Sequence, residues 1–136
     1  MSCNSAIYAA NSNPQTIAAN TQTVINFGQI VRAFGPNTNL SGGNVTVNTA
    51  GYYVADTNFT VTTAAGTTVT IKIMKDGVEI PGASAINVYG TAQTEMSVSI
   101  PFMIRNMCCH ESTITAVITS TAAATVNNAA VLIRKV

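Results

Sequence analysis

The chain has 136 residues, of which 47% are hydrophobic and only 8% are charged, and its formal net charge is +1. This length fits one domain with a sizeable core. The near-zero charge argues against a partner that is nucleic acid or an anionic membrane, and no apolar run approaches the ~20 residues of a transmembrane helix. With so few charges a monomer would present an unusually uncharged surface, which is a first indication of subunit contacts.

Residues 1–21 show no regular alternation of apolar and polar side chains, and Pro14 interrupts them. We therefore expect an extended N-terminal arm in front of a domain that spans residues 22–136. The arm's few large apolar side chains, Ile7, Tyr8 and Ile17, are candidates for anchoring it to a partner protein. The alternative is an arm that lies along its own subunit or a neighbouring one. No basic segment precedes an apolar one here, so we expect no signal peptide.

From Thr23 onward, Val, Ile, Thr and Tyr dominate the sequence, which favours strands. Apolar and polar residues alternate most clearly in four segments, at residues 44–48, 68–73, 97–104 and 113–119. Glycine-containing turn signals separate the segments, and Asp76-Gly77 is a strong hairpin signal. Pro81-Gly82 indicates a further loop. The pattern predicts an all-β jelly-roll sandwich of about eight to ten antiparallel strands and no helix.

The closing segment, residues 125–136, is apolar on both faces over much of its length. A strand that is covered on one side only should alternate. Two interpretations stay open: a central strand in a tight sandwich, or a strand with one face in the core and the other near a subunit interface.

The segment Gly51-Tyr52-Tyr53-Val54-Ala55-Asp56, which follows a short strand and opens a long Thr-rich one, resembles the signature of the tumour-necrosis-factor and complement-type globular-head superfamily. Residues 75–83 and 127–136 resemble a hairpin and the last strand of its bacterial and phage members, and residues 4–20 resemble small phage-associated proteins of this type. The resemblance implies a jelly roll that assembles as a compact homotrimer. Its expected interface residues are Tyr52, Tyr53, Phe59 and Leu132, of which the first three are alternatively core residues.

Catalysis needs placed acids, bases or nucleophiles, and the five carboxylates of this chain form no such group in the sequence. We expect no catalytic residue, no cofactor and no enzyme. Cys108, Cys109 and His110 could bind zinc together with Cys3, but adjacent cysteines rarely chelate one ion. Ordinary thiols and a disulfide to Cys3 are the alternatives, and ordinary thiols are favoured. Among the few aromatic residues, Tyr89 is a candidate ligand contact.

These observations favour a virion structural protein, a homotrimeric capsid decoration or head fibre of a bacteriophage. It would be made in the host cytoplasm and would contact capsid or other virion proteins through its arm. The alternative is a receptor- or glycan-binding adhesion module of a spore or cell surface. We expect neither nucleic acid nor membrane as a partner.

Overall fold

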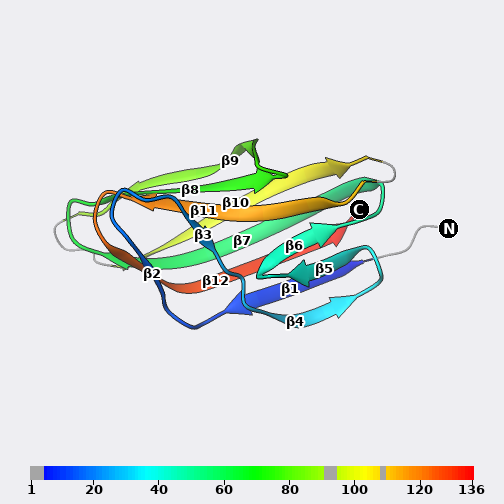
Figure 1. Ribbon diagram of the computed structural model, residues 1–136, viewed down its shortest axis with the longest axis horizontal. Coiled ribbons are helices and arrows are strands. Elements are labelled where there is room, and N and C mark those ends of the chain that lie inside the picture. Colours follow the sequence, from blue (N-terminus) through cyan, green and yellow to red (C-terminus); the bar gives the residue numbers. More distant parts are fainter. Residues whose placement is uncertain (1–4, 91–94, 108–109) are drawn as a thin grey trace.

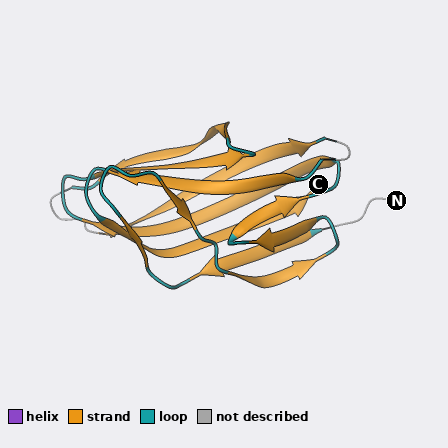
Figure 2. Cartoon of the chain, in the orientation of Figure 1, coloured by secondary structure: helices purple, strands orange, loops and turns teal. Residues whose placement is uncertain are grey.

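The computed structural model describes residues 5–90, 95–107 and 110–136. Strands account for all the regular structure in these ranges (Figures 1 and 2). None of the described residues belongs to a helix long and apolar enough to cross a membrane. The strands are β1 (Ala6–Asn11), β2 (Gln15–Ile17), β3 (Thr23–Ile25), β4 (Gln29–Phe34), β5 (Thr38–Ser41), β6 (Asn44–Val47), β7 (Gly51–Thr63), β8 (Thr68–Lys75), β9 (Val78–Val88), β10 (Glu95–Asn106), β11 (Ser112–Ser120) and β12 (Ala124–Lys135).

The strands form two antiparallel sheets that pack face to face. Sheet A has the order β10-β7-β12-β1-β4, and β2 also pairs with β12. Sheet B has the order β5-β6-β11-β8-β9, and β3 also pairs with β11. The predicted all-β jelly-roll sandwich is confirmed. Strands outnumber the expected eight to ten in part because residues before Thr23 also enter the sheets.

The core lies between the sheets and is built from alternate residues of each strand. In β8, Val69, Ile71 and Ile73 are buried, whereas the polar residues between them are partly exposed. The rings of Phe27 and Phe59 meet in this core with their centroids 5.9 Å apart. Burying one such large apolar side chain stabilises the fold by roughly 1.5–3 kcal/mol, so the alternation in sequence dictates the sandwich.

The turn residues explain how neighbouring strands reverse direction. Asp76 has a φ of +52° and Gly77 one of +82°, and Lys75 pairs with Val78 across them. Two positive φ angles define a type I′ turn, so the predicted hairpin is confirmed. The loop expected at Pro81-Gly82 is wrong, because both residues lie inside β9. Proline is tolerated there since β9 is an edge strand, whose outer backbone groups have no ladder partner.

The expected N-terminal arm over residues 1–21 is not confirmed. Strand β1 lies inside sheet A between β12 and β4, and Ile7 pairs with Ile133. The Ile7 side chain is 0% exposed and that of Ile17 is 1% exposed. Neither can anchor a partner from the folded chain, so this part of the expectation is wrong. Tyr8 points the other way and is 40% exposed.

Candidate functional site

The outward face of sheet A, which is turned away from sheet B, carries an unusual set of side chains. Antiparallel pairing places Tyr8 of β1 opposite Leu132 of β12, Leu132 opposite Asp56 of β7, and Asp56 opposite Pro101 of β10. Directly paired residues point to the same side of a sheet, so these four form one row across it. Both Tyr8 and Leu132 are 40% exposed.

A second row lies next to the first on the same face. It runs from Ala6 through Arg134 and Val54 to Met103, whose side chain is 57% exposed. At the end of the face Tyr52 is 52% exposed, and the Arg105 guanidinium lies 5.9 Å from the centre of its ring. That distance is within the range of a cation–π contact.

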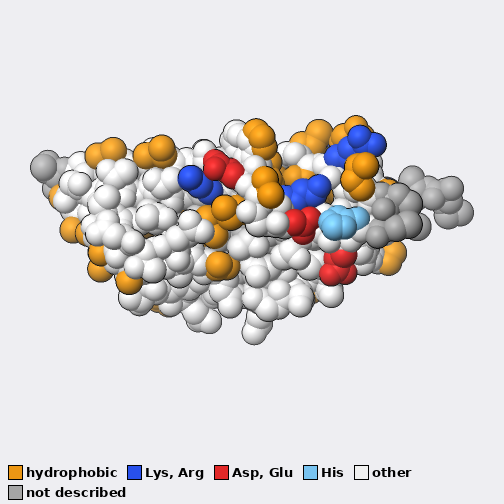
Figure 3. Space-filling model, turned by 45° about the horizontal axis from the view of Figure 1, so that its top comes forward, with side chains coloured by type: hydrophobic (Ala, Val, Ile, Leu, Met, Phe, Trp, Pro, Cys, Tyr) orange, Lys and Arg blue, Asp and Glu red, His pale blue; other side chains and the backbone are white. Residues whose placement is uncertain are grey.

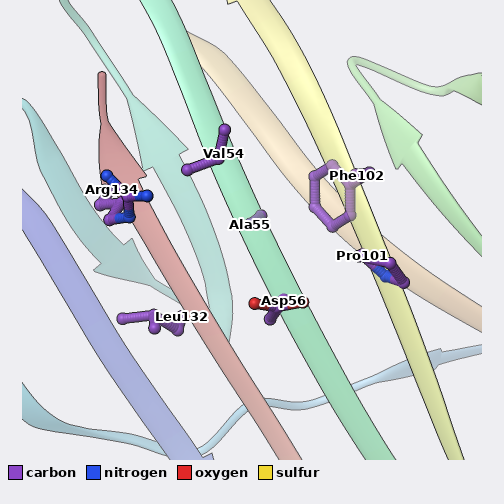
Figure 4. A pocket seen from close by; sticks show the side chains of 7 residues that line it. All are labelled: Val54, Ala55, Asp56, Pro101, Phe102, Leu132 and Arg134. Carbon is purple, nitrogen blue, oxygen red and sulfur yellow. The ribbon is translucent and has the colours of Figure 1, made fainter.

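The two rows enclose a hollow of about 410 Å³ on the outward face of sheet A. Figure 4 shows Leu132 and Arg134 on β12, and Val54 and Asp56 on the neighbouring β7. The hollow is thus an apolar surface with one carboxylate and one guanidinium. Its lining residues are Val54, Ala55, Asp56, Pro101, Phe102, Leu132 and Arg134.

The outward face of sheet B differs in chemistry. On its central strands β8 and β11 the outward positions are mostly threonines, namely Thr68, Thr70, Thr113, Thr115 and Thr119. In the view of Figure 3, Lys, Arg, Asp, Glu and His side chains gather toward one end of the surface, with hydrophobic side chains between them. Outside these central strands, sheet B also exposes apolar side chains, namely Val24 of β3 and Val78, Ile86 and Val88 of the edge strand β9. The threonines are well solvated in water, whereas the exposed Tyr, Leu and Met side chains of sheet A favour contact with a partner protein.

The predicted interface residues divide between this face and the core. Tyr52 and Leu132 lie on the outward face of sheet A. Tyr53 and Phe59 are wholly buried inside the sandwich, so an interface role for them is wrong and a core role is correct. The Tyr53 hydroxyl donates a hydrogen bond of 2.8 Å to the carbonyl oxygen of Thr49. Burial raises the pKa of this phenol, although the bonds to Thr49 oppose the shift.

Tyr89, the candidate ligand contact, is also buried. Its hydroxyl donates a hydrogen bond of 2.8 Å to the carbonyl oxygen of Val61 in β7. Burial raises the pKa of the phenol, and the negative charge of Glu95 adds to this. Its ring therefore belongs to the core, and no face of it is open to a sugar or another ligand.

The cysteine–histidine segment can be placed only in part, since Cys108, Cys109 and Cys3 lie outside the described residues. The His110 Nε2 atom is 3.1 Å from a carboxylate oxygen of Asp76, whose other oxygen accepts the N–H of Thr113 at 2.9 Å. In the described ranges, no three His, Cys, Asp or Glu side chains come together as a metal-binding group. The Asp76–His110 pair instead fastens the β8–β9 turn to the start of β11.

The Asp76 carboxyl has a shifted pKa. Burial alone would raise this pKa, but the hydrogen bonds from the Thr113 N–H and from His110 outweigh burial and hold it below its usual value. The carboxylate is therefore kept ionised as a structural acceptor.

Comparison with known proteins shows which known fold this chain shares. No protein-family model matches the chain, and no curated protein sequence matches it. Among solved structures, murine APRIL is similar with a TM-score of 0.72 and 13% identity, over 98% of this chain and 99% of that one. PRD1 vertex protein P5 is similar with a TM-score of 0.68 and 14% identity, over 97% and 96% of the two chains. The fold is that of the tumour-necrosis-factor-like jelly rolls.

A third TNF-like jelly roll, Eiger TNF from S. frugiperda, is similar with a TM-score of 0.69 and 10% identity, over 98% of this chain and 91% of that one. Identities this low establish a shared fold and carry no function by themselves. The resemblance deduced from residues 51–56 is thereby confirmed at the level of the fold.

Proposed function

We propose that this TNF-like jelly roll is a non-enzymatic structural protein that assembles as a homotrimer and forms a capsid decoration or head fibre of a bacteriophage virion. Three observations support the proposal. First, the sequence resembles small phage-associated proteins. Second, this resemblance implies a trimer. Third, one protein of similar structure is named as a vertex protein of PRD1.

The side chains on the outward face of sheet A are the main support for self-association. This face exposes Tyr8, Tyr52, Met103 and Leu132, which lie on four neighbouring strands. In sheet B the central strands expose mostly threonine, and the exposed apolar residues Val24, Val78, Ile86 and Val88 lie on β3 and the edge strand β9. Aromatic residues and methionine are enriched in interfaces between subunits, and charged residues are depleted at their centres. We therefore assign the trimer interface to this face, with Tyr52 and Leu132 retained from the sequence-based expectation.

The chemistry of the described residues supports a structural role. Asp76 and His110 form a pair of the kind that can act as acid and base, but they sit on a hairpin turn. The Asp76 carboxylate is already occupied by a backbone N–H. The pair therefore has a structural role, which is to hold the β8–β9 turn against the start of β11.

Light scattering coupled to size exclusion tests the oligomer. We expect about three times the chain mass of 14.1 kDa. A Leu132→Lys variant should shift the protein to monomers, because it places an ammonium group in the buried part of the interface. The matched control, Thr119→Lys on the outward face of sheet B, should stay trimeric. A monomeric wild-type protein at micromolar concentration would refute the assignment.

The virion location needs a separate experiment. Particles purified from a culture that produces this protein should contain the chain by mass spectrometry. Antibody labelling in electron microscopy should place it at regular positions on the head. Its recovery only from cell or spore envelopes would favour the adhesion alternative instead.

A further inference from the structure

Two opposite charges on the outward face of sheet A lack partners among the described residues. Asp56 is exposed on β7 and Arg134 is exposed on β12. Among the described residues neither takes part in an ion pair or a side-chain hydrogen bond. By contrast, Glu79 lies 3.6 Å from Lys72, and Glu95 accepts hydrogen bonds from Thr62 and Asn127.

The register of the strands sets the spacing of the two groups. Asp56 is paired with Leu132, and Arg134 is paired with Val54, so the two charged residues are diagonal neighbours. Diagonal positions of an antiparallel pair are about 7–8 Å apart, which a long side chain can span, but the ion pairs among the described residues do not include Asp56 with Arg134. Figure 4 shows the Arg134 side chain beside Val54 and the Asp56 side chain beside Leu132. The backbone thus places both charges at the rim of one apolar hollow, where the two side chains stay unpaired.

Self-association through this face would remove both charges from water. A buried charge that has no partner is strongly unfavourable, whereas an Arg–carboxylate pair can form two parallel hydrogen bonds. A second copy of the chain offers the missing partner for each, because the same face carries both signs. Around a threefold axis each subunit has two neighbours. It can therefore present its carboxylate to one neighbour and its guanidinium to the other.

We propose that the Asp56 carboxylate of one subunit pairs with the Arg134 guanidinium of the neighbouring subunit, and that this pair specifies the trimer. The inference rests on the proposed self-association through the outward face of sheet A. The Asp56 carboxylate and the Arg134 guanidinium make the contact self-complementary. Because opposite charges must meet, they also favour one arrangement of the subunits over others.

Two other arginines lie on or near the same face. Arg105 is held over the Tyr52 ring. Arg32 sits opposite Tyr8 on the edge strand β4, at the margin of the face. Arg32 therefore provides a matched control, because its reversal changes the charge of the same face without touching the hollow.

The test is charge reversal and exchange, read as the subunit concentration at which the trimer dissociates. Asp56→Arg and Arg134→Asp should each raise that concentration at least ~30-fold, and the double variant should return it to within ~10-fold of wild type. Arg32→Asp should change it less than ~3-fold. Circular dichroism checks folding, and Asp56→Asn and Arg134→Gln replace any reversal that fails to fold.

Each outcome separates this inference from the proposed function. A wild-type monomer would refute both. A wild-type trimer whose single reversals leave dissociation unchanged would refute only the pair. Rescue of Asp56→Arg by Arg32→Asp, or the absence of rescue in the exchanged variant, would also refute the pairing of Asp56 with Arg134.

Discussion

At the scale of single residues, the buried hydroxyl of Tyr89 connects the end of β9 to sheet A. It donates to the Val61 carbonyl oxygen at 2.8 Å, and the Tyr89 N–H donates to the Thr67 carbonyl oxygen at 2.9 Å. Replacing Tyr89 by Phe keeps the ring but leaves the Val61 carbonyl without this donor. We expect the free energy of unfolding to fall by about 1–2 kcal/mol, measured by urea denaturation.

The matched control for this prediction is Thr119→Val, which removes a hydroxyl from the outward face of sheet B. The Thr119 side chain is exposed there, so its hydroxyl is hydrated in the folded and the unfolded chain. The free energy of unfolding of this variant should stay within ~0.5 kcal/mol of wild type at the same protein concentration. A change within ~0.5 kcal/mol for Tyr89→Phe as well would mean that the Tyr89 bond contributes little to stability.

Asp76 makes stability depend on pH. Its pKa in the folded chain lies below the value of about 3.9 for an unfolded chain, so the ionised form favours the fold. This contribution is complete above about pH 5 and is lost as the pH falls through the folded pKa. Between about pH 5 and 2.5, wild-type protein should therefore lose more stability than an Asp76→Asn variant.

Asparagine is the matched substitution because it suits the positive φ of 52° at this position and preserves the type I′ turn. Urea denaturation at several pH values gives the comparison. Parallel pH dependences for wild type and Asp76→Asn would show that the hydrogen bonds from Thr113 and His110 do not favour the carboxylate.

At the scale of elements, Gly28 lets the turn before β4 approach β1. Its φ is +76°, and a Cβ atom there would lie 2.7 Å from the Ala10 carbonyl oxygen and 2.7 Å from the Asn11 Cβ atom. Gly28→Ala therefore adds a clash to an unfavourable backbone angle. We expect it to lower the free energy of unfolding by about 2 kcal/mol or more.

Gly66→Ala separates the cost of the backbone angle from the cost of the clash. Gly66 has a φ of +81°, and nothing lies within 4 Å of the position of an added Cβ atom. Its substitution should cost only the backbone strain, about 1–2 kcal/mol, and so less than Gly28→Ala. Thermal unfolding of both variants would reveal the difference, and equal costs would exclude the clash with β1.

Strands with large apolar residues could be predicted from the sequence. Val69, Ile71 and Ile73 differ so strongly from the residues between them that the buried face of β8 is evident. Strand β1 could not be predicted in the same way. Ala9 is buried and Ala10 is only partly exposed, so two alanines occupy opposite faces and give no contrast in hydrophobicity.

The candidate site could be predicted only in part for a related reason. Tyr52 and Leu132 stood out by residue type. The alternation along β7 could also have separated the two tyrosines, because Tyr53 is in phase with Phe59, whereas Tyr52 is in phase with Asp56. The position of Asp56 beside Leu132 depends on the register between β7 and β12. That register joins segments far apart in the chain, and packing of the whole sandwich determines it.

At the scale of the whole molecule, the core of the described residues explains stability without cysteine. It joins both sheets through isoleucine, valine and aromatic side chains, whereas Cys3, Cys108 and Cys109 lie outside the described residues. A sandwich of this length does not need disulfides to fold. Replacing Cys3, Cys108 and Cys109 by Ser together should therefore leave the β circular dichroism, the oligomer mass and the melting temperature essentially unchanged.

The same variant also tests the alternatives for the cysteine–histidine segment. A loss of folding would favour a structural disulfide. Stoichiometric zinc in the wild-type protein, lost in the triple variant, would favour a metal site.

The place of β1 has a consequence for how the protein is made. Ile7 pairs with Ile133, and the Lys135 N–H donates to the Ser5 carbonyl oxygen at 2.8 Å. During synthesis β1 leaves the ribosome before β12, with nearly the whole domain between them, so sheet A cannot close until β12 has also emerged. Pairing between such distant segments is slow to form, and until it does Ile7 stays exposed. Folding should therefore be a late, all-or-none event in which the nascent chain depends on protection from aggregation.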